Sequence, residues 1–235
     1  MNKPDMNKLI NLKRDIRFEA KSDNEYKLSV YGFIGGWQNN AERVLEQIQQ
    51  TSAEKIHVHI NSGGGSAFEG VAICNILKQH DAEIVVHIDG WAASAASVIA
   101  MAGDKVIMPN NTMMMVHQAS TIEYGNADVF EKTAKDLRKV DTALRASYKN
   151  RFVGSDDELV TLLKDETWLT AEEAVALGLA DEVAEEIEID DTQEEEETVE
   201  NFKDDLVAKY AAQQNNKPPE PEPTQKNMSK LFLNL

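Results

Sequence analysis

The sequence predicts an α/β fold built from repeated strand–turn–helix units, with one long helix added. Three observations lead to this fold class. A strand, a turn and a helix follow one another three times within the first hundred residues. The segment 128–152 repeats apolar residues at steps of three and four, as a long amphipathic helix does. A chain of 235 residues with 42% hydrophobic residues is long enough for one domain with a substantial core.

In the first half of the chain, strand patterns alternate with helix patterns. Strands are indicated by β-rich runs or by alternation of apolar and polar residues, at 26–35, 56–60, 83–88, 105–108 and 112–117. Helical spacing covers 41–50 and the segment after Ser66, whose distance from Glu69 in sequence is that of a capping box. The small apolar segment 91–101 is interpreted as a buried helix.

The second half begins with the long helix over 128–152. Thr170 and Glu173 form another capping-box pattern, which predicts a helix directly after Thr170. Gly178 ends that helix, and a short strand over 179–183 completes the domain.

The two ends of the chain differ from the domain at 26–183. Residues 1–25 are polar and mixed in charge, and we interpret them as an arm with at most one short strand or helix. Residues 184–235 form an acidic tail that we expect to be largely disordered, because acidic and Gln/Asn/Pro-rich stretches have few apolar residues to bury. The tail ends in the apolar peptide 228–235, which we interpret as a docking peptide.

Composition excludes several classes of protein. The formal net charge is −17, of which 181–217 contribute −11, so we expect neither nucleic acid nor a membrane surface as the main partner. The longest apolar stretch, 91–102, contains two serines and is shorter than the roughly 20 residues of a membrane span. The first residues lack the apolar core of a secretory signal. The single cysteine, Cys74, allows no internal disulfide and fits a reducing, cytoplasmic compartment.

The glycine run Gly63–Gly65 is the first candidate for chemistry. Glycines between a strand and a helix expose backbone N–H groups that can bind a phosphate or stabilise an oxyanion. The run lacks the Lys-Ser/Thr of a P-loop and the spaced glycines of a dinucleotide site. A simple tight turn is the other interpretation.

Two serines and one histidine are candidates for nucleophilic catalysis. Ser94 ends the sequence Gly-Trp-Ala-Ala-Ser, where small neighbours leave room for a substrate backbone, although close helix packing explains the same pattern. Ser97 lies one helical turn further on and is the rival serine. His117 ends a predicted strand, and it is either a general base or an ordinary histidine at a strand end.

The remaining histidines and the cysteine favour structural roles. His57 and His59 form a His-x-His pair on one strand face, which is half of a metal site, but no third ligand has a diagnostic spacing and no metal is predicted. His80 and His87 are interpreted as surface or edge residues. Cys74 lies among apolar residues and is interpreted as a small core side chain.

Two acidic residues, Asp165 and Glu166, precede the sequence Thr-Trp-Leu-Thr and the last predicted helix. One interpretation is an acidic first turn that complements the helix dipole. The other is the acid that orients a catalytic histidine.

These motifs are more specific in combination than alone. Asn-Ser-Gly-Gly-Gly, Gly-x-Ala-Ala-Ser, Met-x-His-Gln and Leu-Thr-Ala-Glu-Glu-Ala-x-x-x-Gly-Leu-Ala-Asp follow one another along the chain. In this order they resemble the Clp-type proteolytic subunits, which are serine peptidases, and more narrowly the head-maturation proteases of tailed phages and prophages. The resemblance covers about 26–183. It implies a ClpP/crotonase-like α/β fold of repeated strand–strand–helix units with a protruding long helix.

The resemblance also implies the site, with the nucleophile at Ser94, the base at His117, the acid at Glu166 and the oxyanion donors at Gly65 and Ala95. The family usually has Asp at the third triad position, and Asp165 is one residue away, so that position stays open between the two. Gly63 stands where the family usually has proline. The implied reaction is hydrolysis of peptide bonds, and it needs no metal or cofactor.

The resemblance implies protein or peptide substrates and a homo-oligomer, either a heptameric ring or two stacked rings. A capsid or scaffold protein and a Clp ATPase are candidate partners, and a phage-encoded protein would work in the bacterial host cytoplasm. The alternative is a catalytically weak or inactive Clp-like body acting as a capsid assembly protein. Crotonase-like hydratases share the fold but usually rely on acidic residues rather than on a Ser–His pair. A membrane-bound signal-peptide peptidase of the same superfamily is disfavoured, because the sequence has no membrane segment.

Overall fold

The structure is a computed structural model, and it describes residues 17–184 except 23, 37–38 and 50–51. These residues belong to the first of the two units into which the chain divides. The predictions for residues 1–16, for the acidic tail beyond Ala184 and for the docking peptide 228–235 lie outside the described residues.

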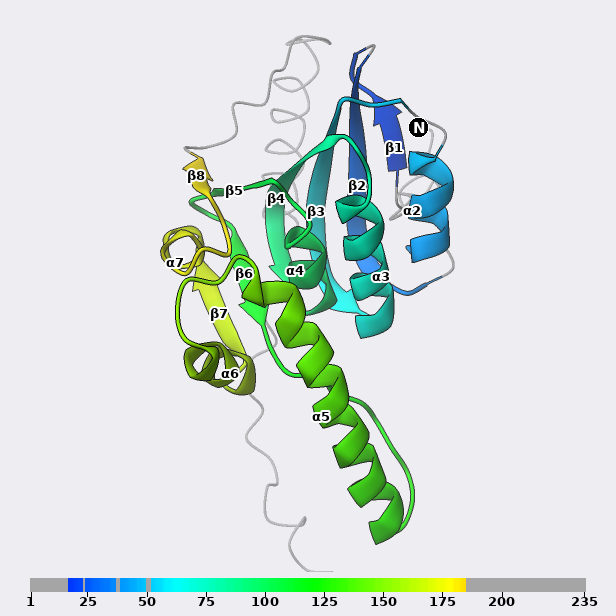
Figure 1. Cartoon of the computed structure of the whole chain (residues 1–235), viewed down its shortest axis with the longest axis vertical. Coiled ribbons are helices and arrows are strands. Elements are labelled where there is room, and N and C mark those ends of the chain that lie inside the picture. The colour runs from blue at the N-terminus through cyan, green and yellow to red at the C-terminus, as the bar shows by residue number, and fades with distance from the viewer. Residues whose placement is uncertain (1–16, 23, 37–38, 50–51, 185–235) are drawn as a thin grey trace, which may run out of the picture. The chain divides into compact units, whose positions relative to one another are not determined.

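The described part of the chain contains one sheet of eight strands, in the order β1-β2-β3-β4-β5-β8, with β6 beside β4 and β7 beside β6 (Figure 1). The strands are β1 (Arg17–Ala20), β2 (Glu25–Ile34), β3 (Lys55–Gly65), β4 (Glu83–Ala93), β5 (Lys105–Pro109), β6 (Met113–Val116), β7 (Thr167–Thr170) and β8 (Glu182–Ala184). All neighbouring pairs are parallel except β1 with β2 and β6 with β7. This is the mixed α/β fold that the sequence predicts.

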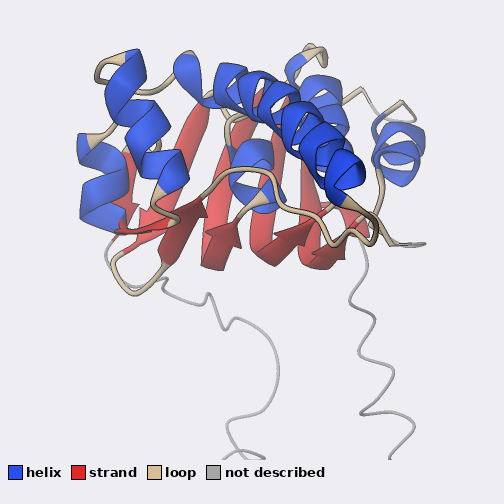
Figure 2. Ribbon diagram, turned by 90° about the horizontal axis from the view of Figure 1, so that it is seen from below, coloured by secondary structure: helices blue, strands red, loops and turns tan. Residues whose placement is uncertain are grey.

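The helices of the described residues gather on one face of the sheet (Figure 2). They are α2 (Ala41–Ile48), α3 (Ala67–Lys78), α4 (Ala95–Ala100), α5 (Ala127–Lys149), α6 (Asp156–Lys164) and α7 (Ala171–Ala176). In strand β3, apolar and polar residues alternate, so they lie on opposite faces of the sheet. Ile56, Val58 and Ile60 are buried on the helix side, and the histidines between them lie on the other side.

Strand β4 is shared by two parts of the sheet. Its first half, Val85–His87, pairs with β5, and its last three residues, Trp91–Ala93, pair with β6. The segment 91–101 is therefore not one helix, and that prediction was wrong for its first three residues. Small apolar residues suit a buried strand and a buried helix equally well, so composition alone did not reveal the boundary before α4.

The glycine run is also part of a strand rather than a turn. After a register shift, Gly64 and Gly65 pair with Phe33 and Ile34 of β2, so β3 continues to the point where α3 begins. Ser66 caps α3 by accepting a hydrogen bond from the Glu69 N–H at 3.4 Å. The Glu69 carboxylate does not complete the capping box, because it accepts from the Ala41 N–H at 2.7 Å instead.

The second half of the chain follows the predicted order, with one helix added. Helix α7 begins directly after Thr170, with both hydrogen bonds of the capping box to Glu173 in place. Sequence analysis missed α6, although Ser155 and Glu158 give it the same complete box. This helix buries Leu159 and Leu163.

The N-terminal part of helix α5 projects away from the sheet and the other helices (Figure 1). Its buried residues, Leu144 and Tyr148, lie near its C-terminal end, whereas Phe130 near its start is 52% exposed. The helix thus protrudes as predicted, and the first part of its apolar stripe has no core to pack against.

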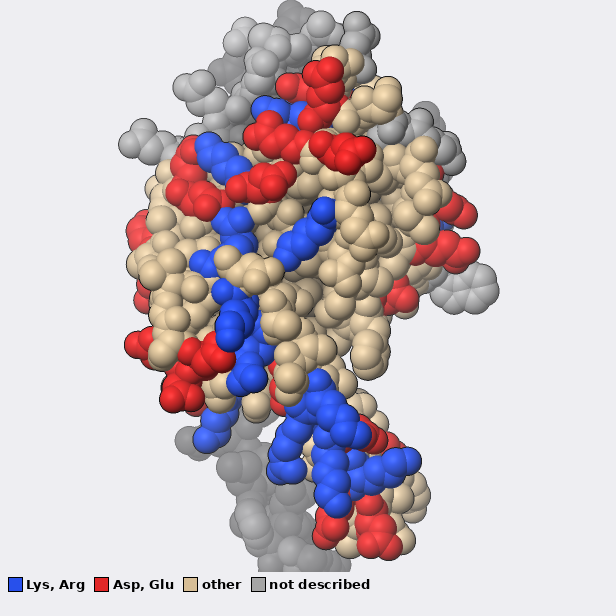
Figure 3. Space-filling view, viewed as in Figure 1, with Lys and Arg blue, Asp and Glu red and all other residues tan. Residues whose placement is uncertain are grey.

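Charge is unevenly spread over the surface. On the helix-covered side, Lys and Arg side chains cluster on α5, and acidic side chains gather toward the end where β8 lies (Figure 3). Among the described residues, no helix is both long and apolar enough to cross a membrane.

Candidate active site

The register of the sheet brings Ser94 and His117 together. Strands β4 and β6 are parallel, and Ala93 of β4 is paired with Met115 of β6. Ser94 and His117 follow these paired positions at the same edge of the sheet. The His117 Nε2 atom lies 2.7 Å from the Ser94 Oγ atom, which is hydrogen-bond distance. A histidine in this position can take the hydroxyl proton and turn the serine into a nucleophile.

The backbone of Ser94 is in the left-handed region, with φ 57° and ψ −124°. Its N–H donates to the Met115 carbonyl at 2.9 Å, so the β6 ladder holds this conformation. Among the described residues, the only other non-glycine residue with positive φ is Glu166, at φ 50°. Such backbone costs free energy and tends to be retained at functional sites.

Ser97, the other candidate for the nucleophile, forms hydrogen bonds with groups other than His117. It is fully buried, and its Oγ atom donates to the Ser94 carbonyl at 2.6 Å. The same Oγ atom lies 2.8 Å from the Tyr148 hydroxyl. A hydroxyl engaged in this way is not positioned to attack a substrate, so the geometry favours Ser94.

Strand β7 places an acidic residue opposite the histidine. It runs antiparallel to β6 with Val116 paired to Thr167, so Glu166 is the next residue across from His117. The Glu166 Oε1 atom lies 3.6 Å from His117 Nδ1, and the Glu166 side chain is 72% exposed. This is an ion-pair distance, longer than a hydrogen bond. Asp165 is one position further away, where it caps the C-terminal end of α6.

Two glycines of β3 let the backbone approach the serine. A β carbon on Gly64 would lie 2.6 Å from Ser94 Cβ and 3.0 Å from the Ala95 N atom. A β carbon on Gly65 would lie 2.0 Å from the Ile34 carbonyl oxygen, and both glycines have positive φ. A larger residue at Gly64 would displace the backbone around Ser94, and one at Gly65 would displace the neighbouring strand β2 at Ile34. The interpretation as a simple tight turn is thus replaced by a strand end packed against the serine.

The serine and the histidine open onto one cleft of about 460 Å³. Gly65, Ser94, Ala95 and His117 lie on its wall, and the side chains of Val140, Leu144 and Tyr148 reach it from α5. The loop after His117 is fixed by two hydrogen bonds, from Gln118 N–H to the Leu163 carbonyl at 2.9 Å and from Ala119 N–H to Asp141 at 2.7 Å. Sequence analysis read Tyr148 only as part of an apolar stripe, and the sequence gives no signal that its hydroxyl reaches Ser97.

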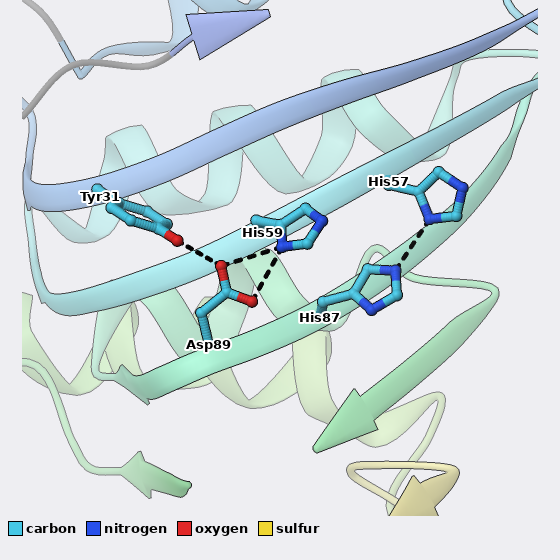
Figure 4. Close-up of polar contacts among 5 residues, drawn as sticks. All are labelled: Tyr31, His57, His59, His87 and Asp89. Carbon is cyan, nitrogen blue, oxygen red and sulfur yellow. Dashed lines mark hydrogen bonds and ion pairs between the residues drawn. The ribbon is translucent and has the colours of Figure 1, made fainter. Parts of the chain in front are cut away.

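His57, His59 and His87 lie away from the cleft, on the sheet face opposite the helices (Figure 4). His59 Nδ1 contacts both Asp89 carboxylate oxygens at 2.9 and 3.0 Å, and Tyr31 donates a hydrogen bond to the same carboxylate. His57 Nδ1 lies 2.9 Å from His87 Nε2. Among the described residues, no group of three His, Cys, Asp or Glu side chains is arranged to hold a metal ion.

Burial lowers the pKa of two histidines in this cluster, His57 and His87. It lowers the pKa of His87 to about 4, with the neighbouring histidines adding to the effect. Burial also opposes ionisation of Asp89, but the hydrogen bonds from His59 and Tyr31 outweigh it, so the pKa of Asp89 is lowered. Cys74 is buried in the core, as predicted.

Comparison with known proteins identifies the family. Residues 37–187 match the family model described as Clp protease. An ATP-dependent Clp protease proteolytic subunit of Deinococcus radiodurans is 31% identical over 148 residues, which cover 62% of this chain and 70% of that protein. The subunit with the same description from Bacteroides fragilis is 31% identical and covers 54% of this chain and 63% of that protein. The ATP-dependent Clp protease proteolytic subunit 3 of Rhizobium meliloti is 28% identical and covers 70% of this chain and 86% of that protein. The chain therefore belongs to the Clp protease family.

Proposed function

We propose that the protein is a serine endopeptidase that hydrolyses peptide bonds through Ser94, His117 and Glu166. The observation that carries the proposal is the 2.7 Å distance between Ser94 Oγ and His117 Nε2, in a cleft large enough for a peptide segment. Membership of the Clp protease family supports it, as does the left-handed backbone at Ser94.

The reaction follows from the positions of these groups. His117 Nε2 takes the hydroxyl proton while Ser94 Oγ attacks the peptide carbonyl carbon, and the carbonyl oxygen becomes an oxyanion. The N–H groups of Gly65 and Ala95 stabilise this oxyanion, each by about 3 kcal/mol of barrier. His117 then gives its proton to the leaving amine, and water attacks the acyl-enzyme by the same route. Glu166 stabilises the positively charged imidazolium.

A test of the nucleophile uses a fluorophosphonate probe, which labels only an activated serine. We expect Ser94→Ala to abolish labelling and peptide cleavage together. Ser97→Ala is the matched control and should still label to completion, because the second serine does not attack. Full labelling of the Ser94→Ala protein would show that the assignment is wrong.

The physiological substrate is proposed from the resemblance to phage head-maturation proteases, which points to capsid-protein precursors. Cleavage of such a precursor can be compared with cleavage of an unfolded protein such as casein. Faster, site-specific cleavage of the precursor by the wild-type protein, absent in Ser94→Ala, is the expected result. Equal, unselective cleavage of both would instead support general degradation.

One observation favours the second candidate, a weakly active or inactive body acting in capsid assembly. The 3.6 Å separation of Glu166 Oε1 from His117 Nδ1 is longer than a hydrogen bond, so the third contact of the triad is loose. The rate of labelling distinguishes the two functions, since an inactive assembly protein would leave Ser94 unlabelled and a weakly active one would label it slowly.

A further inference from the structure

A chain of hydrogen bonds runs from α5 to the peptide unit that follows the proposed nucleophile. The Tyr148 hydroxyl lies 2.8 Å from Ser97 Oγ, and Ser97 Oγ lies 2.6 Å from the Ser94 carbonyl oxygen. Both side chains are buried, with Ser97 at 0% and Tyr148 at 1% exposure. The mechanism described above uses neither of them.

The number of protons and acceptors determines which group donates in each of these hydrogen bonds. A serine hydroxyl has one proton, and a carbonyl oxygen can only accept, so Ser97 donates its proton to the Ser94 carbonyl. The Tyr148 hydroxyl must then be the donor to Ser97 Oγ. Burial raises the pKa of Tyr148, so its hydroxyl keeps the proton that it donates.

The Ser94 carbonyl and the Ala95 N–H belong to one peptide unit. The described residues contain no cis peptide bonds, so these two groups point in opposite directions. Fixing the carbonyl on one side therefore fixes the direction of the N–H on the other side. Ala95 lines the cleft, and its N atom would lie 3.0 Å from a β carbon placed on Gly64. A hydrogen bond to the carbonyl also polarises the peptide unit and strengthens its N–H as a donor.

We propose that Ser97 and Tyr148 are positioning residues, which orient and polarise the Ser94–Ala95 peptide so that its N–H meets the oxyanion. This inference rests on the proposed peptidase function. Tyr148 lies in the last turn of α5, so the same chain ties the protruding helix to the nucleophile. The Ser94 carbonyl also accepts from the Ser97 N–H at 3.0 Å and from the Val98 N–H at 3.3 Å, so the hydroxyl bond adds to a hold that the first turn of α4 already gives. The positive φ of Ser94 makes this added bond useful, because a strained peptide unit relaxes unless its surroundings hold it.

The experiment compares Tyr148→Phe, Ser97→Ala and the double variant in cleavage of a fluorogenic peptide. We expect Tyr148→Phe to lower kcat about three- to ten-fold and Ser97→Ala about ten- to hundred-fold, since losing a whole oxyanion donor costs about 100- to 1,000-fold. KM should stay within two-fold. The inhibition constant of a peptide boronate, which forms a tetrahedral adduct on the serine, should rise by the same factor as kcat/KM falls.

The double variant tests whether Tyr148 acts through Ser97. Its kcat should equal that of Ser97→Ala alone, because Tyr148 has no route to the peptide without the serine hydroxyl. Tyr31→Phe is the matched control: it also removes a tyrosine hydroxyl bond, to Asp89 on the opposite sheet face, and should leave kcat unchanged.

The outcomes separate this inference from the function on which it rests. Independent, multiplying losses in the double variant, or losses in KM with an unchanged boronate constant, would overturn the positioning role while leaving the peptidase intact. If Ser97→Ala does not fold, Tyr148→Phe still decides: unchanged kcat and boronate affinity would overturn the role. A wild-type protein without cleavage dependent on Ser94 would overturn both proposals.

Discussion

Ser94 and Glu166 are 72 positions apart in sequence, and both have a positive φ. Each such conformation costs about 1–3 kcal/mol outside glycine. Ser94 directly follows β4 and Glu166 directly precedes β7, so one strand ladder holds each residue on one side. Among the described non-glycine residues, only Ser94 and Glu166 have this strained backbone. This supports Glu166 as the acid.

Replacing Glu166 with glutamine tests its role. The substitution keeps the shape of the side chain and removes the negative charge that stabilises the imidazolium. We expect kcat to fall by at least ten-fold with the melting temperature unchanged, since the side chain is 72% exposed. Asp165→Asn is the matched control and should change kcat less than two-fold. A larger loss in Asp165→Asn would mean that the β6–β7 register in solution differs by one residue.

The histidine cluster predicts how stability depends on pH. Burial and the neighbouring His59 and His57 lower the pKa of His87 from 6.5 to about 4, while Asp89 opposes them. Between pH 6.5 and 4 the unfolded chain therefore binds a proton at His87 that the folded chain does not bind. Stability from this residue is complete above pH 6.5 and declines as the pH falls to 4.

Thermal melting at pH 7.0 and 4.5 measures this decline. We expect the melting temperature to fall at the lower pH and to fall less in His87→Asn, which does not titrate. His59, His57, Asp89 and Lys21 face the same site and are present in both proteins, so the comparison measures His87 together with its coupling to these groups. An identical pH dependence in the two proteins would contradict the prediction.

At the level of elements, the N-terminal caps of α7 and α3 differ in how many hydrogen bonds they make. Thr170 and Glu173 make both bonds of their capping box, whereas Ser66 makes a single 3.4 Å bond to α3. We expect Thr170→Ala to destabilise the body by about 1 kcal/mol, which is about 2–4 °C for a domain of this size. Ser66→Ala should cost less, and calorimetry of both variants measures the difference. Each substitution removes one bond to the cap hydroxyl, of 3.3 Å for Thr170 and 3.4 Å for Ser66, so an equal loss would show that completing the box does not strengthen the cap.

Most elements could be predicted because their signals are local. Alternation in β3, the apolar stripe of α5 and the Thr170 cap each depend on neighbours in sequence. The boundary between β4 and α4 could not, because it is set by pairing of Trp91–Ala93 with β6. Helix α6 was predictable from its Ser155 cap but was overlooked.

The candidate site was predictable in its residue types but not in its geometry. The order of motifs suggested Ser94, His117 and an acid, yet the choice between Glu166 and Asp165 depends on which residue of β7 lies opposite β6. The contact between Ser97 and Tyr148 spans 51 positions and depends on how α5 crosses α4. Neither fact is contained in local sequence patterns.

For the whole molecule, the exposed end of α5 supports assembly. Ile122 is 100% exposed, Tyr124 97% and Phe130 52%, and all three lie at or near the start of the protruding helix. Apolar side chains grouped in this way are usually covered by a partner. We therefore expect a homo-oligomer, with a heptameric ring or stacked rings suggested by the family resemblance.

Sedimentation of the wild-type protein and of Phe130→Ser tests this expectation. The wild-type protein should sediment as an oligomer at micromolar concentration, and Phe130→Ser should shift it toward smaller species. Glu131→Gln, on an exposed neighbouring position of the same helix, is the control and should sediment like the wild type. A wild-type monomer would contradict the expectation.

Because the only cysteine is buried, the reactivity of its thiol measures how often the core of the protein opens. Cys74 is 2% exposed on the core side of α3, and burial raises the pKa of its thiol, so a thiol reagent reaches it only after α3 has moved away. The rate of labelling under native conditions therefore measures how often the core opens, without any added probe. Because the chain has no second cysteine, a disulfide-linked dimer on a non-reducing gel would come from opened molecules and not from the native assembly.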